Sequence, residues 1–151
     1  MIADPVAAFV TVSAALTGFN EAELWGTGQV EAYLARLTDV AGADVTAELL
    51  ETALTALKAT DPKTELRLKV LDHEDLGPVA RNAMVMWYLG QWDPMPATWR
   101  ERHGMHPEDD ARVVSASAWR AGLVWPAIRS HPMGARPTGF ASWAEPPRTG
   151  P

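Results

Sequence analysis

Residues 83–96 read AMVMWYLGQWDPMP, and a second stretch of similar character, GFASWAEPP, spans residues 139–147. Together the two stretches hold three of the seven tryptophans and four of the twelve prolines, with no plausible catalytic acid, base or nucleophile. Large apolar side chains on irregular backbone are typical of contacts with another protein. These stretches therefore predict a chain that binds a partner and performs no reaction itself.

The first stretch closes a predicted helix. Its apolar residues indicate a helix over residues 79–89, which the sequence LGP (76–78) precedes. Gly90 follows at the position where helices commonly end in a left-handed turn. From residue 91 to 110 the helical period is lost, and this part is predicted to be a loop that is functional or is ordered by a partner.

Two Asp-Pro pairs mark helix starts upstream, because Asp is a good N-cap and Pro fits the first helical position. The pair Asp4-Pro5 predicts a helix of about three turns, which Gly18 ends. The pair Asp61-Pro62 predicts a short helix that reaches residue 70 or 71.

Two more helices are predicted between these pairs. Asn20 and Glu23 have the spacing of a capping box and open a helix that continues past Gly26-Thr27-Gly28, with a distortion at the glycines. Asp44 is predicted to cap a helix over residues 45–59, whose leucines lie on one face.

Residues 111–124 suit a sixth helix, which Pro126 ends. Strand-like alternation is absent from the sequence. The predicted fold is all-α: a small bundle of about five to six helices over residues 1–125, with a long Pro- and Trp-rich extended tail over residues 126–151. Both parts belong to the same structural unit.

Composition excludes several classes of protein. A net charge of −6 leaves no basic stripe for nucleic acid, and no apolar run is long enough to cross a membrane directly. The absence of cysteine excludes disulfides, thiolate metal sites and cysteine nucleophiles.

Two histidine-containing segments offer alternatives with chemistry. His103 and His106, with Glu108 close behind, could ligate a metal, and a stand-alone metal-dependent enzyme is one alternative function. His73 beside Glu74 and Asp75 could form a general base with its orienting carboxylate, although such a triplet is more often a polar connection.

The tryptophans point to binding. Trp87 lies on the apolar face of the helix over residues 79–89, where core packing is favoured. Trp92, Trp99 and Trp143 are flanked by loop-forming residues, which favours an exposed interface. A carbohydrate-binding module that uses these loop tryptophans is a further alternative.

Three motifs carry a resemblance to a known family. The segments are FVTVSAALTGF (9–19), MWYLGQW (86–92) and PTGFASWAEPP (137–147). In this order they resemble the small (gamma) subunit of bacterial membrane-associated flavin-dependent sugar and polyol dehydrogenases, of the glucose, sorbitol and fructose dehydrogenase type.

The resemblance implies a non-catalytic subunit with no cofactor or metal of its own. Its partner would be a large catalytic subunit of the glucose–methanol–choline type that holds FAD and often an iron–sulfur cluster. A cytochrome c subunit completes some of these complexes. The small subunit would bind, stabilise or mature the catalytic one. The partner-binding residues predicted from the motifs and the tryptophans are Trp87, Tyr88, Trp92, Trp99, Phe140, Trp143, Pro146 and Pro147.

The resemblance also implies a place in the cell. Small subunits of this family commonly carry a twin-arginine leader and reach the periplasm, at the periphery of the inner membrane. No Arg-Arg pair precedes Ile2. Two expectations therefore stand: a periplasmic protein whose leader has been removed, or a cytoplasmic one.

Overall fold

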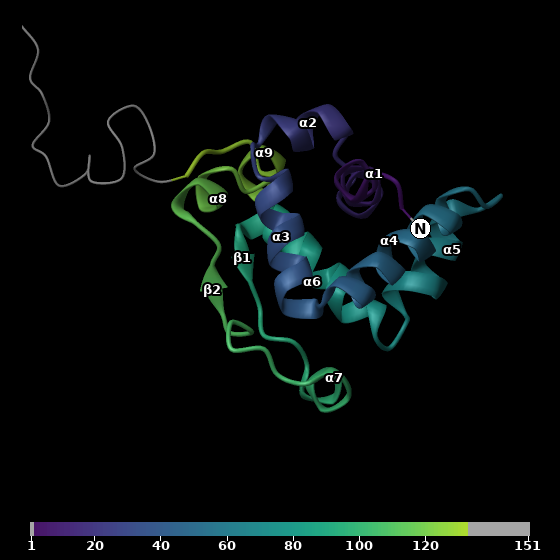
Figure 1. Ribbon diagram of the computed structural model, residues 1–151. Helices are drawn as coiled ribbons and strands as arrows, with labels where there is room; N and C mark the ends of the chain where they lie inside the picture. Colours follow the sequence, from purple (N-terminus) through teal and green to yellow (C-terminus); the bar gives the residue numbers. More distant parts are fainter. Residues whose placement is uncertain (1, 133–151) are drawn as a thin grey trace, which may run out of the picture.

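The computed structural model describes residues 2–132, and this part of the chain is mainly helical, as predicted (Figure 1). The elements before residue 90 are α1 (Pro5–Thr17), α2 (Glu21–Gly26), α3 (Val30–Ala41), α4 (Ala43–Leu57), α5 (Pro62–Leu66), the π-helical turn η1 (Arg67–Leu71) and α6 (Leu76–Leu89). The later elements are β1 (Gln91–Trp92), α7 (Ala97–His103), β2 (Arg112–Val113), α8 (Ala116–Arg120) and α9 (Val124–Ala127).

The predicted signals at the N-terminal helices are confirmed. Asp4 Oδ1 accepts hydrogen bonds from the first backbone N–H groups of α1, and Gly18 ends the helix in the left-handed region. The side chain of Asn20 accepts from the Glu23 N–H while Glu23 accepts from the Asn20 N–H, each at 2.9 Å. These ends depend on bonds within four residues, so the local sequence is sufficient to specify them.

The single helix predicted from Asn20 onward is wrong, because the glycines break it into α2 and α3. Thr27 donates its hydroxyl to the Leu24 carbonyl at 2.7 Å, and Gly28 takes a φ of +70°. A left-handed residue cannot continue a right-handed helix. A smaller correction concerns α4, where Gly42 and not Asp44 occupies the cap position.

The predicted helix from Asp61-Pro62 to residue 71 is confirmed as α5 followed by η1. The helix predicted over residues 79–89 is also confirmed, but α6 begins three residues earlier, at Leu76. His73 explains the earlier start, since its Nδ1 accepts from the backbone N–H groups of Asp75 and Leu76. This contact satisfies donors at the helix start.

Helix α6 is the centre of the fold. It packs against α1, α3, α4, η1, β1 and α8, while α5 lies at the outside against α4 and η1 (Figure 1). Gly90 ends α6 with a φ of +67°, as predicted, and a Cβ on this residue would lie 2.5 Å from the backbone of Ala118. Position 90 therefore requires glycine for two reasons: its backbone is left-handed, and the backbone of α8 leaves no room for a Cβ.

The predicted loop over residues 91–110 is wrong in part. β1 and β2 pair antiparallel, with Gln91 opposite Val113 and Trp92 opposite Arg112. Helix α7 lies within the connection between them, at one end of the two-stranded ribbon, and α8 lies at the other end (Figure 1). Strand pairing of two residues leaves too short a pattern to be read from sequence.

The helix predicted over residues 111–124 is also wrong. In its place are β2, α8 and α9, because two backbone bonds hold the segment to α6. The Val114 N–H donates to the Gly90 carbonyl at 2.8 Å, and the Leu123 N–H donates to the Trp87 carbonyl at 2.9 Å. Each of these donors would be used within a continuous helix. The path of residues 111–124 is therefore set by these bonds to the end of α6 and not by the helical period of the segment.

The helix end predicted at Pro126 is wrong. Pro126 belongs to α9 and does not end a helix before it, and Pro132 is buried. The rest of the predicted tail, from residue 133 on, lies outside the described residues. Over residues 2–132, no helix combines the length and apolar composition needed to cross a bilayer.

Candidate partner-binding surface

An aromatic cluster in the core links the motif at residues 9–19 to the motif at residues 86–92. The rings of Phe9 and Trp87 stack at 5.9 Å between centroids, and Tyr33 meets Trp87 edge to face at 4.9 Å. All three side chains are buried, which confirms the core position favoured for Trp87. Burial raises the pKa of the Tyr33 hydroxyl well above its ordinary value, because the phenolate would be poorly solvated.

Tyr88 makes a second link between the same motifs. Its hydroxyl donates to the Thr17 carbonyl at 2.7 Å, across 71 positions of sequence. Its ring also meets Phe19 edge to face at 6.0 Å. The bond satisfies a carbonyl in the last turn of α1, which has no partner within the helix. Tyr88 is half-buried, so part of this predicted partner-binding residue stays open to contact.

Trp92 belongs to the chain's own core, so its predicted exposure on a loop is wrong. Its side chain is 0% exposed, and its indole nitrogen donates to Asp109 Oδ1 at 2.9 Å. The same carboxylate accepts from the Met95 N–H at 2.9 Å and from Arg100 Nε at 2.6 Å. The three hydrogen bonds to Asp109 therefore hold the connection between β1 and β2 against the buried Trp92 side chain.

The surroundings of Asp109 keep it ionised. Burial by itself raises the pKa of this carboxyl, but the bonds from Arg100, Trp92 and Met95 outweigh burial and leave the pKa below its ordinary range. No local pattern signals its actual role, because its partners precede it by 9 to 17 positions.

Trp99 is buried as well, so the exposed position predicted for it is also wrong. It is 3% exposed, stacks on the His103 ring at 4.3 Å between centroids, and donates its indole N–H to the Asp75 carbonyl at 3.0 Å. Asp75 Oδ1 in turn meets Arg102 Nε and His103 Nε2, each at 2.8 Å. These contacts hold α7 against the start of α6, and the bonds from His103 and Arg102 lower the pKa of Asp75.

The residues of the metal alternative have separate partners. His103 contacts Asp75, His106 Nδ1 accepts from the Glu108 N–H at 3.2 Å, and the Glu108 carboxylate pairs with Arg36 of α3. Across residues 2–132, no three His, Asp or Glu side chains converge in a way that could hold a metal ion. His73 caps α6 and does not pair with Asp75 through its side chain, so the geometry does not favour the proposed general base.

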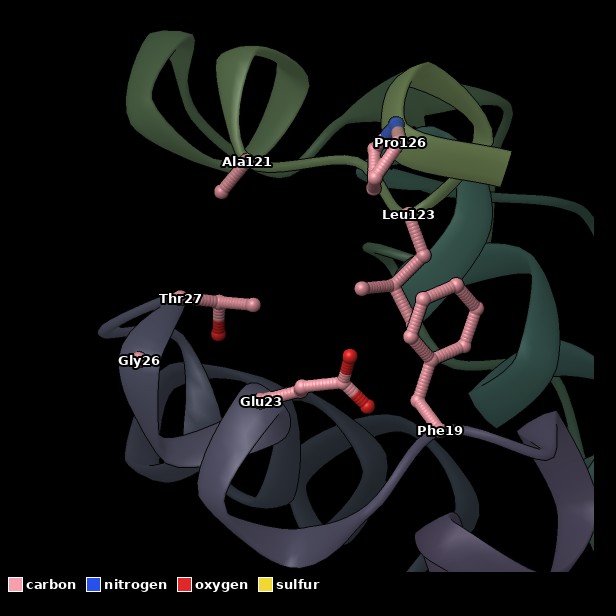
Figure 2. Close-up of a pocket in the computed structure, with 7 residues that line it drawn as sticks. All are labelled: Phe19, Glu23, Gly26, Thr27, Ala121, Leu123 and Pro126. Carbon is pink, nitrogen blue, oxygen red and sulfur yellow. The ribbon is translucent and has the colours of Figure 1, made fainter. Parts of the chain in front are cut away.

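An open groove lies between α2 and the α8–α9 segment, with a volume of about 430 Å³ (Figure 2). The residues that line it are Phe19, Glu23, Gly26, Thr27, Ala121, Leu123 and Pro126. Figure 2 shows Phe19, Leu123 and Pro126 along one side, with the Glu23 carboxylate reaching into the opening from α2. An apolar wall beside one charged group suits an apolar side chain that is accompanied by a cation.

Two large apolar side chains are exposed on the elements that border the groove. Trp25 of α2 is 49% exposed, and Ile128, which follows α9, is 60% exposed. The sequence-based interpretation missed Trp25, although helical spacing offers a signal: Leu24 is buried, so its neighbour points outward. Large apolar groups at a groove on a protein surface are typical of an interaction site.

Charge is distributed unevenly along the chain. Residues 1–57 hold eight acidic side chains and one basic side chain, a net of −7, while residues 58–151 hold 12 basic and 11 acidic ones. The single basic residue of the first part, Arg36, is paired with Glu108. The α2 side of the groove is therefore negative, and a basic segment is favoured there.

Comparisons with protein-family models, curated proteins and solved structures gave no match for this chain. Of the predicted partner-binding residues, the structure brings Trp87 and Tyr88 together with Phe9, Thr17 and Phe19. Trp92 and Trp99 are buried in the same hydrophobic core as Trp87. Phe140, Trp143, Pro146 and Pro147 lie outside the described residues. For the carbohydrate-binding alternative, neither Trp92 nor Trp99 presents its ring to a sugar.

Proposed function

We propose that this chain is a non-catalytic small subunit of a flavin-dependent sugar or polyol dehydrogenase, which binds and matures a large FAD-containing catalytic subunit. One observation supports the proposal above the others. The first two motifs that resemble the family, residues 9–19 and 86–92, form a single structural unit although about 70 positions separate them in the chain.

The contacts within that unit involve the residues that define the motifs. Phe9 stacks on Trp87, Tyr88 bonds to Thr17, and Phe19 packs on the Tyr88 ring. Residues that stabilise one another in a fold are expected to occur together in a family that shares the fold. Packing between the two motifs is therefore a physical reason for them to occur together, which supports the proposal.

The surface supports the same proposal. The groove between α2 and α9 lies next to exposed Trp25 and Ile128, and the third motif begins five residues after the last described one. Trp143 of that motif would supply an apolar anchor to the partner, and burying an aromatic of its size contributes about 2–3 kcal/mol. FAD, and an iron–sulfur cluster where present, would belong to the catalytic subunit. A cytochrome c subunit would complete the complex where one is present.

The proposal is tested by co-expression with the large open reading frame next to this gene, a tagged pull-down of this chain and an absorption spectrum. We expect a yellow partner of flavoprotein size to co-elute in a fixed ratio, with sugar or polyol oxidation in the complex. A colourless chain that elutes as a folded monomer beside a soluble, separately purified flavoprotein would contradict the proposal. The same experiment with periplasmic and cytosolic fractions locates the complex.

A further inference from the structure

The groove between α2 and α9 lies close to the point where the described chain ends. Pro126 lines it, and Pro132, six residues later, is the last described residue and is buried. Eight residues beyond Pro132 comes Phe140, the first aromatic residue of the segment over residues 133–151. Eight extended residues span up to about 26 Å, so this segment is long enough to return to the groove.

A tethered side chain has an advantage over a free one. A short linker holds its end at an effective concentration in the millimolar range, so an apolar groove beside the tether is filled by its own chain before a separate molecule reaches it. Phe19 supplies an aromatic edge within the groove, and pairs of aromatic rings favour one another beyond the area that they bury.

The charges agree with this occupant. Residues 133–151 carry Arg136 and Arg148 against the single acid Glu145, so the segment is basic while the α2 side of the groove is acidic. Glu23 uses Oε2 to accept from the Asn20 N–H at 2.9 Å, which leaves Oε1 for a cation. Arg136 precedes Phe140 by four residues and would pair with Glu23 when Phe140 enters the groove.

We propose that the groove receives Phe140 of this chain's own C-terminal segment, with Arg136 paired to Glu23. Phe140 then fixes the start of the segment on the helical body instead of contacting the partner, and Trp143, three residues further, stays available to the partner. This last step rests on the proposed function, whereas docking of Phe140 concerns the isolated chain alone.

The absence of cysteine makes the test direct, since an engineered pair has no competitor. Ala121→Cys in the groove is combined with Ala141→Cys beside Phe140 in the full chain, without any partner, under mild oxidation. The matched control combines Ala141→Cys with Val113→Cys on β2, an exposed position outside the groove that lies at a similar separation along the chain from residue 141. We expect the groove pair to form its disulfide on the order of tenfold faster than the control pair.

A second set of variants identifies the side chain. Adding Phe140→Ala to the groove pair should slow the cross-link to the rate of the control pair, and Phe140→Leu should restore most of the rate, while Trp143→Ala should have no effect. Equal rates for the groove and control pairs would overturn the inference. So would a cross-link that depends on Trp143 and not on Phe140. Because no partner is present, neither result bears on the pull-down that tests the proposed function.

Discussion

The indole nitrogen of Trp92 donates a 2.9 Å hydrogen bond to Asp109, across 17 positions of sequence and between two fully buried side chains. The same carboxylate accepts from Met95 and Arg100. One ionised group thus holds β1, α7 and the approach to β2 together. This explains why a segment with no helical period and several prolines is nevertheless folded against α6.

Asp109→Asn should lower the free energy of unfolding by about 2–3 kcal/mol, because bonds to a charged acceptor are stronger than bonds to a neutral one and the Arg100 guanidinium loses its counter-ion. Chemical denaturation measures the change. Asp110→Asn is the matched control, since Asp110 is exposed and pairs only with Arg112 among the described residues. Its effect should stay within about 0.5 kcal/mol. Equal effects of both substitutions would contradict the role assigned to Asp109.

Stability should fall in acid, and Asp109 should account for part of the fall. Its folded-state pKa lies below the unfolded value of about 3.9, so its contribution is present above that value and is lost as the pH falls through the folded-state pKa. The stability difference between the native chain and Asp109→Asn should therefore shrink when denaturation is repeated below pH ~3.9. Asp75, whose pKa is also lowered, retains part of the acid dependence in the variant. A difference that is constant with pH would count against this account.

Gly90→Ala should destabilise the fold by about 3 kcal/mol, since the new Cβ meets both a left-handed φ and the Ala118 backbone at 2.5 Å. Gly18→Ala is the control at the end of α1, where φ is +80° in the same left-handed region but the space around the new Cβ is open. It should cost about 1–2 kcal/mol. Thermal unfolding of the two variants separates the steric contribution from the conformational one, and similar melting temperatures would argue against close packing of α8 on the end of α6.

Tyr88→Phe should cost about 1 kcal/mol, because it leaves the Thr17 carbonyl without its donor and keeps the ring on Phe19. Tyr33→Phe makes the same chemical change at a hydroxyl that is buried and has no hydrogen-bond partner among the described residues. Removing an unpaired buried hydroxyl should be neutral or stabilising. The two variants are compared by urea denaturation, and a larger loss for Tyr33→Phe would contradict the assigned contacts.

Trp143→Ala should weaken the proposed complex while leaving the helical content of the chain unchanged, since the residue is assigned to the partner. Trp92→Ala should instead lower the stability of the isolated chain by about 3–5 kcal/mol, because it opens a cavity in the core. Circular dichroism and the pull-down separate the two effects. A loss of helix in Trp143→Ala would mean that Trp143 packs within its own chain.

The sequence by itself determined the features that depend on neighbours along the chain. The Asp4 cap, the reciprocal bonds of Asn20 and Glu23, and the left-handed ends at Gly18 and Gly90 are each completed within about four residues. A short window therefore contains all the information that such an end requires. The all-α class and the central position of Trp87 follow from the apolar period of the same helices.

Only the tertiary structure decided the positions of Trp92 and Trp99, the role of Asp109 and the course of residues 111–124. The indole N–H of Trp92 is accepted by a carboxylate 17 positions away, and that of Trp99 by the backbone carbonyl of Asp75, 24 positions earlier. The segment after β2 leaves its own helical pattern because carbonyls of α6 and Gly90 accept its N–H groups. Such contacts join residues that are distant in the chain, so their free energy appears in no local pattern and becomes visible only when the helices pack.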